Sequence, residues 1–209
     1  MTRGDLLILL DRVIPHLPDA GLHALIEGFI PFDAVASTGN QKLSLLDEVK
    51  VFHAASLRGA YYDAFDVNSK NYMDKSAGTE NWIADCTRLL DGATKVSEEG
   101  DPTEIQQAFD LIFALLRRID RCEDDVIFFA DEPGSWQVGI DWPKVLPAWF
   151  RCLAATVEPE DYAFLVDEAI NDFVRREAPK YLAMARAAAT PEQQAALAST
   201  TGPEEAPRR

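Results

Sequence analysis

The sequence has few cysteines and no long apolar run, and each scarcity excludes a class of protein. Its three cysteines, Cys86, Cys122 and Cys152, are odd in number and far apart, and no C-x-x-C pair is present. A zinc ribbon or a thioredoxin-type site is therefore not supported. The apolar run near the N-terminus stops at Asp11 and is too short for a signal-peptide core or a membrane span. We expect a cytoplasmic protein with reduced thiols.

Basic residues are scarce as well. The chain has 20 Lys and Arg against 35 Asp and Glu, which gives a net charge of −15. Such a surface repels nucleic-acid phosphates and anionic lipid headgroups, so we expect neither direct nucleic-acid binding nor membrane attachment. The charge either supports solubility alone or favours encounter with a basic partner. The expected partner is a protein with a basic surface.

Motifs that carry catalytic or metal chemistry are missing. The sequence has no H-E-x-x-H, no E-x-x-H pair, no calcium-binding D-x-D-x-D-G loop, no G-x-S-x-G elbow and no phosphate-binding glycine loop. His16 and His23 flank the first predicted turn, and His53 lies on an apolar helix face. We therefore expect no metal ion and no cofactor.

Helical periodicity is present over most of the 209 residues. We predict an all-α fold of about eight helices, arranged as an irregular bundle or a short α-solenoid. A single domain is expected over 1–199, with a disordered tail over 200–209. The expected helices cover 5–14, 18–30, 42–65, 79–96, 102–129, a helix beginning after 141, 158–176, 178–190 and one or two turns after 190.

The helix predicted over 102–129 has the clearest start signal. Asp101 is a good N-cap, and Pro102 suits the first helical turn. The helix is apolar nearly all round between Ala108 and Leu116, a pattern typical of the middle of a bundle. We expect it to be the core element.

Two further helix starts are predicted from caps and prolines. Thr79 is the expected N-cap of the helix over 79–96. Asp141 is the expected cap of a later helix, with Pro143 in its first turn. Pro147 removes one intrahelical hydrogen bond, which predicts an irregular or delayed start there.

The stretch 124–150 contains three of the four tryptophans. Pro133 and Gly134 suit the central positions of a type II turn. The period of two in the next residues indicates an extended segment with one buried side, which we call the tryptophan strap. Its apolar residues are Trp136, Val138, Ile140 and Trp142. We predict that the strap locks two helices together through buried rings.

The same stretch offers an alternative, a binding site. In this interpretation Trp136 and Trp149 line a groove that holds a peptide or ligand, with acidic side chains at its mouth that steer a basic partner. The candidate binding residues are Asp124, Asp125, Asp131, Glu132, Trp136 and Trp149.

Two segments carry a resemblance to known families. LRGAYYDAFD resembles the small-aromatic packing of TPR-type helices, and FALLRRIDRCEDD with the following DEPGSWQVGIDWPKVLPAWFRCLA is similar to helical arrays beside SWIM-type zinc fingers in bacterial proteins. The likeness covers about half of the chain. The C-x-C…C-x-H pattern of that zinc finger is absent, so no metal or DNA role transfers. The resemblance implies a protein-interaction scaffold.

Three functions are consistent with these observations. The first is a non-enzymatic interaction module with an acidic binding surface. The second is an immunity or antitoxin-type protein that neutralises a basic partner by charge mimicry. The third is a hydrolase with a carboxylate site around Asp131, Glu132 and His53, which requires those groups to converge in one pocket.

Overall fold

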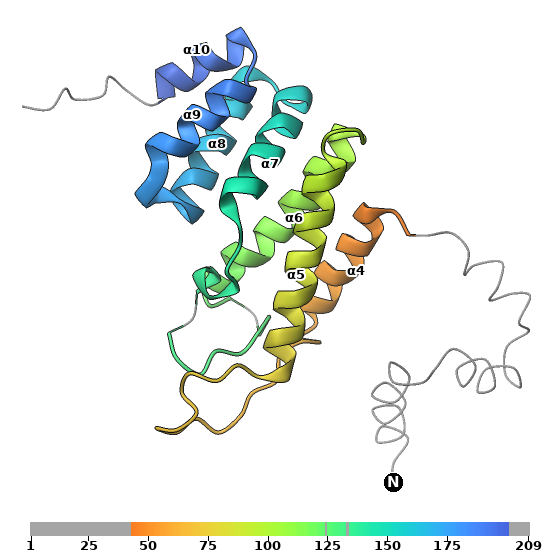
Figure 1. Ribbon diagram of the computed structural model, residues 1–209, viewed down its shortest axis with the longest axis vertical. Helices are drawn as coiled ribbons and strands as arrows, with labels where there is room; N and C mark the ends of the chain where they lie inside the picture. Colours follow the sequence, from red (N-terminus) through yellow and green to blue (C-terminus); the bar gives the residue numbers. More distant parts are fainter. Residues whose placement is uncertain (1–42, 124, 133, 201–209) are drawn as a thin grey trace, which may run out of the picture. The chain divides into compact units, whose positions relative to one another are not determined.

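The computed structural model describes residues 43–123, 125–132 and 134–200. This part of the chain contains seven α-helices, two short 3₁₀ helices and no strand, so the predicted all-α class is confirmed (Figure 1). The α-helices are α4 (Leu45–Leu57), α5 (Ala77–Val96), α6 (Pro102–Asp120), α7 (Trp142–Thr156), α8 (Pro159–Phe173), α9 (Ala178–Ala188) and α10 (Pro191–Thr200). The 3₁₀ helices are η2 (Ser135–Val138) and η3 (Arg175–Glu177).

Some predictions fall on residues that the structure does not describe. The helices expected over 5–14 and 18–30, and with them His16 and His23, lie outside the described residues. The single domain over 1–199 and the tail over 200–209 therefore stay predictions.

The helices form two groups joined by α7 (Figure 1). In the first group α4, α5 and α6 pack against one another, and in the second α8 packs against α9 and α10. Helix α7 packs against α5 and α6 on one side and against α9 on the other. Its buried residues join both groups in one hydrophobic core.

Helix α6 is the central element, as predicted. Asp101 accepts a hydrogen bond from the backbone N–H of Thr103 at 2.8 Å, and Pro102 is the first helical residue. Eight of its residues are buried, against α4, α5 and α7. The predicted end at residue 129 is wrong, because Cys122 adopts a left-handed φ of 53° just after the helix stops at Asp120. The acidic side chains that follow would also oppose the helix dipole.

Helix α4 is shorter than predicted because Gly59 ends it. Gly59 has a φ of 69°, and its N–H donates to Ser56 O while Ala60 N–H donates to Ala55 O. These two bonds form a Schellman motif, which closes the helix at Leu57.

The starts of α5 and α7 also differ from the predictions. Ser76, not Thr79, caps α5 by accepting from Thr79 N–H at 3.1 Å. Helix α7 begins regularly at Trp142 and continues through Pro147, so the predicted delay is wrong. Asp141 is its N-cap residue but makes no side-chain cap bond, because its carboxylate pairs with Lys144 at 2.9 Å.

Two loops meet at one end of the bundle, residues 58–76 and the described residues 121–123, 125–132 and 134 (Figure 1). The Phe128 ring packs edge-on against Tyr62 and Phe65, with ring centroids 6.1 and 5.1 Å away. Thr79 Oγ1 donates to Phe128 O at 2.7 Å. These contacts fix the loop that leads into η2.

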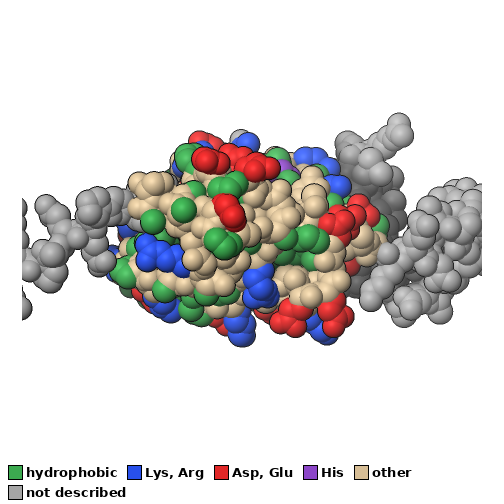
Figure 2. Space-filling view, turned by 90° about the horizontal axis from the view of Figure 1, so that it is seen from above, with side chains coloured by type: hydrophobic (Ala, Val, Ile, Leu, Met, Phe, Trp, Pro, Cys, Tyr) green, Lys and Arg blue, Asp and Glu red, His purple; other side chains and the backbone are tan. Residues whose placement is uncertain are grey.

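Acidic residues do not form one continuous patch on the face drawn in Figure 2. Lys and Arg side chains are interspersed there with Asp and Glu. The thiols of Cys86 and Cys152 are buried and that of Cys122 is exposed, and all three are free.

Candidate functional site

The tryptophan strap is not extended at Trp136. Ser135–Val138 forms η2, so the predicted alternation of buried and exposed residues fails there. Gly134 has a φ of 168° and is extended, which excludes the predicted type II turn with its φ near +80° at this position. The 3₁₀ turn places Val138 inward at 5% exposure and leaves Trp136 70% exposed.

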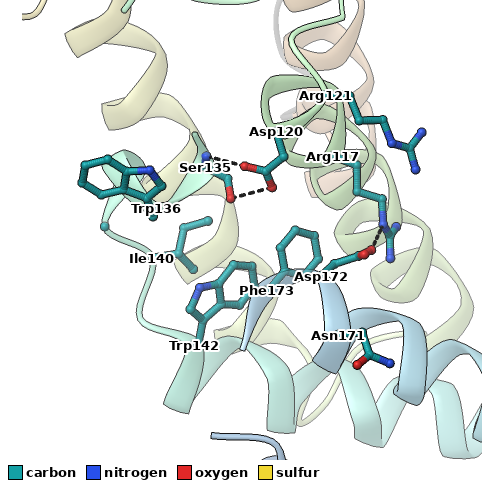
Figure 3. A pocket seen from close by; sticks show the side chains of 11 residues that line it. Arg117, Asp120, Arg121, Ser135, Trp136, Ile140, Trp142, Asn171, Asp172 and Phe173 are labelled. Atoms are coloured by element: carbon teal, nitrogen blue, oxygen red, sulfur yellow. Dashed lines mark hydrogen bonds and ion pairs between the residues drawn. The ribbon is translucent and has the colours of Figure 1, made fainter. Parts of the chain in front are cut away.

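Asp120 at the end of α6 fixes η2 in place. Its carboxylate accepts from Ser135 N–H at 2.7 Å and from Ser135 Oγ at 2.9 Å (Figure 3). Lys75 Nζ donates to Gln137 O at 3.0 Å from the neighbouring loop. The short turn that carries Trp136 is therefore tied to two other parts of the fold.

Trp149 has no access to a partner. It is 2% exposed, and its Nε1–H donates to Asp110 Oδ1 at 2.8 Å. Its ring packs against Phe113 and Phe150 in the core. The predicted groove between Trp136 and Trp149 is therefore not formed.

The indole N–H of Trp149 takes part in a network of polar side chains. Asp110 also accepts from Gln106 Nε2 at 3.2 Å, and Gln106 Oε1 accepts from Thr156 Oγ1. Burial of the Asp110 carboxyl raises its pKa, and the hydrogen bonds from Trp149 and Gln106 oppose that rise. This carboxylate has a structural role in the core.

The predicted acidic residues lie in the loop between α6 and η2. Asp125, Asp131 and Glu132 are exposed and form no ion pair with other described residues, and Asp124 lies outside the described residues. His53 lies half-buried on α4, where burial and nearby Arg118 lower its pKa. Of the described residues, no three His, Cys, Asp or Glu lie where they would hold a metal ion together.

A groove opens beside η2 instead. A cavity of about 590 Å³ lies between the end of α6, η2, the start of α7 and the end of α8 (Figure 3). A second cavity of about 600 Å³ shares Trp136, Trp142, Asp172 and Phe173 with the first and extends to η3. We call the two together the aromatic groove. Neither Asp131, Glu132 nor His53 lines it, so it is not the carboxylate site of the hydrolase hypothesis.

Stacked rings form one wall of the aromatic groove. Trp142 stacks on Phe173 with ring centroids 4.7 Å apart and an interplanar angle of 17°. Phe173 also contacts Phe113 in the core, at 5.3 Å between centroids. The Arg117 guanidinium lies over the Phe173 ring, 5.4 Å from its centroid. This wall is anchored in the hydrophobic core and is therefore preorganised.

Arg117 is the best-coordinated cation of the groove. Its Nε donates to Asp172 at 2.6 Å and its terminal nitrogen to Glu168 at 3.2 Å. Its side chain is only 21% exposed. Arg117 thus joins α6 to α8 and shapes the groove, but its charge is already neutralised.

Sequence reasoning did not identify Arg117, Phe173 or the arginines of η3 as site residues. Phe173 reads as one position of an amphipathic helix, and Arg175 and Arg176 read as its polar end. A pair of arginines directly after this amphipathic helix is the available signal. Only the packing of α8 beside η2 brings these residues to Trp136.

Comparisons of the chain with family models, curated proteins and solved structures find no match. The likeness to TPR-type and SWIM-associated helical arrays therefore stays a prediction. In the part that the structure describes, no helix is both long and apolar enough to cross a bilayer.

Proposed function

We propose that this chain is a non-enzymatic, cytoplasmic protein-interaction module, and that the aromatic groove is its contact site. The observation that carries the proposal is the placement of Trp136. Its ring is 70% exposed, at the mouth of a cavity, on a turn that Asp120 holds in place.

Such a placement is unusual for a tryptophan that serves only the fold. Trp82 and Trp149 are at most 2% exposed, and Trp142 is half-buried in the groove wall. Tryptophan is enriched among the residues that dominate binding energy at interfaces, because its large ring buries much apolar area. An exposed ring beside a preformed groove therefore supports an anchor role.

Gly134 supports the same interpretation. A Cβ atom at Gly134 would lie 2.4 Å from Trp136 Cδ1, so the indole ring rests directly on the glycine backbone. The ring is thus exposed to solvent but restricted on one side. Such preorganisation lowers the entropy cost of binding.

The size of the groove fits a peptide side chain or a short segment. Each of its two cavities, of about 590 and about 600 Å³, falls within the usual range for ligand sites, roughly 300–1,000 Å³. Aromatic side chains from η2, α7 and α8 line it. This mixture of apolar wall and polar rim is typical of small recognition sites.

Capture of partners by the full-length chain tests the proposal. The immobilised wild type is compared with Trp136→Ala and with Phe164→Ala, whose ring is 64% exposed on α8 and lines neither cavity. We expect proteins retained by the wild type and by Phe164→Ala to be lost by Trp136→Ala. The same set of proteins on all three would contradict the proposal.

A second candidate is the immunity or antitoxin-type protein that neutralises a basic partner. It is favoured by Asp125, Asp131 and Glu132, which are exposed in the loop between α6 and η2 without an ion pair to other described residues. Neutralising these three acids should slow association with a basic partner and flatten its dependence on salt. Neutralising three exposed acids elsewhere, Glu160, Asp161 and Glu192, is the matched control.

A further inference from the structure

We infer that the aromatic groove binds an acidic segment of a partner protein. An aromatic or aliphatic side chain of that segment packs against Trp136, and its carboxylates face Arg121, Arg175 and Arg176. The inference rests on the proposed function and names the chemistry of the partner that the groove fits.

The first support is a set of cations that the fold leaves unpaired. Arg121 lines the first cavity, and Arg175 and Arg176 line the second. All three are exposed, and none forms an ion pair with another described residue. The guanidinium groups are therefore free to bind a ligand.

The second support is that the acids lining the groove are already engaged. Asp120 accepts two hydrogen bonds from Ser135, and Asp172 pairs with Arg117. Glu177 pairs with Lys180 at 2.7 Å. Asp120 keeps its negative charge, because Ser135 is neutral, so Arg121, Arg175 and Arg176 stand against one unpaired carboxylate in the lining. The charge that remains for a ligand is therefore positive, although the whole chain carries −15.

The third support is the grouping of these arginines. Arg88 and Arg117 form ion pairs with carboxylates, whereas Arg58, Arg151 and Arg186 form none with another described residue. Lack of an ion pair is therefore common among the described arginines. What distinguishes Arg121, Arg175 and Arg176 is that all three line the cavities of one groove.

Guanidinium and aromatic groups together select the ligand. Arginine donates in a planar fork that matches a carboxylate, and its weak hydration lowers the cost of desolvation at an interface. The rings of Trp136, Trp142 and Phe173 supply the apolar contact between the two arginine-bearing rims. A purely acidic chain would leave that apolar wall uncovered, so the segment carries both chemistries.

Long-range repulsion from the net charge makes this a contact of short reach. The net negative charge of the chain repels an anionic segment at a distance, and the arginines attract it only within the groove. Salt weakens this attraction by screening. We therefore expect slow association of an isolated acidic peptide and a modest affinity.

The test is a titration of the full chain with labelled peptides, read by fluorescence anisotropy. The probe is an acetylated and amidated peptide of sequence DEFDELFED, and its charge-reversed counterpart is KRFKRLFKR. We expect the acidic peptide to bind, and Trp136→Ala to weaken it about tenfold, as truncation of an interface anchor does.

Two charge-reversal variants distinguish the effect of the groove arginines on peptide affinity from the effect of the net charge of the chain. Arg175→Glu with Arg176→Glu should weaken the acidic peptide about tenfold, because two attractive pairs become repulsive. Lys50→Glu with Arg186→Glu changes the net charge equally at exposed residues outside the groove, and should change the affinity far less. Circular dichroism confirms that each variant is folded.

Three outcomes would overturn the inference. These are binding of the charge-reversed peptide at least as tightly as the acidic one, binding of neither peptide, and equal effects of the two double reversals. If the basic peptide binds and needs Trp136, the inference falls while the proposed function stands. If partner capture is independent of Trp136, the proposed function itself falls.

Discussion

Trp149 and Trp136 come from one short stretch of sequence and occupy opposite environments. Trp149 lies on α7 and is 2% exposed in the hydrophobic core, where its Nε1–H donates a hydrogen bond to Asp110. Trp136 is 70% exposed on η2, with its ring against the backbone of Gly134. The comparison shows that the backbone decides the role of a tryptophan: a regular helix facing α6 buries one ring, and a 3₁₀ turn at the bundle end presents the other.

The two regions also differ in how their polar groups are satisfied. Around Trp149 a half-buried carboxylate, an amide and a hydroxyl form a hydrogen-bonded network beside the core. Around Trp136 two of the groove's acids are ion-paired, Asp120 is hydrogen-bonded to Ser135, and three arginines are open to solvent. The first arrangement stabilises the fold, and the second leaves interactions for a partner.

The largest expected effect is on the buried ring. Trp149→Ala removes a fully buried side chain and leaves a cavity beside Phe113, so the free energy of unfolding should fall by about 3–5 kcal/mol. Urea denaturation measures the change. A loss below about 1 kcal/mol would place Trp149 outside the core and remove the contrast with Trp136.

A smaller loss is expected at a second buried tryptophan. Trp82 Nε1–H donates to Ser56 Oγ at 2.8 Å, and both residues are 0% exposed. Ser56→Ala leaves this donor unsatisfied, at a cost of about 1–3 kcal/mol. In a Trp82→Phe background the same substitution should cost less, because no donor remains. Equal costs in both backgrounds, from thermal or urea unfolding, would mean that this hydrogen bond contributes nothing.

The acid in the Trp149 network gives a dependence on pH. Burial raises the pKa of Asp110 above its ordinary 3.8, so the folded state holds this proton more tightly than the unfolded chain does. The protonated Asp110 carboxyl therefore contributes to the free energy of unfolding. This contribution is fully present below the ordinary pKa and is lost as the pH rises through the raised pKa. Asp110→Asn removes this term, so its stability relative to the wild type should improve from about pH 3.5 to pH 7. A constant difference across that range would show that Asp110 titrates as it does in the unfolded chain.

The smallest expected effect on stability is at Trp136. Trp136→Ala should change the free energy of unfolding by no more than about 0.5 kcal/mol, as at ordinary surface positions. Its effect belongs to binding instead. A loss comparable with that of Trp149→Ala would return Trp136 to the structural role of the tryptophan strap.

Elements with strong local signals could be predicted from the sequence. The start of α6 follows from Asp101 and Pro102, and the buried stripe of α5 with Trp82 and Cys86 follows from helical spacing. The end of α4 also has a sequence signal, because glycine often ends a helix and Gly59 does so here, but the apolar spacing continues beyond it and favours a longer helix.

The aromatic groove could not be predicted in the same way. The alternation of apolar residues around Trp136 does not distinguish a strand from the 3₁₀ turn that forms, and the hydrogen bonds that Ser135 donates to Asp120 hold the turn in place. The unpaired state of Arg175 and Arg176 depends on which carboxylates the fold brings near, a property of several helices together. Net charge therefore pointed to a basic partner, whereas the groove itself is lined by free arginines.

The most direct test of the account is ¹⁹F NMR of the full chain labelled with 5-fluorotryptophan. The four tryptophans give separate signals that single Trp→Phe variants assign. We expect the Trp136 signal to respond to exchange of H₂O for D₂O and, with that of Trp142, to shift on addition of the acidic peptide, while those of Trp82 and Trp149 stay unchanged. A Trp136 signal that ignores both solvent and peptide would contradict the account.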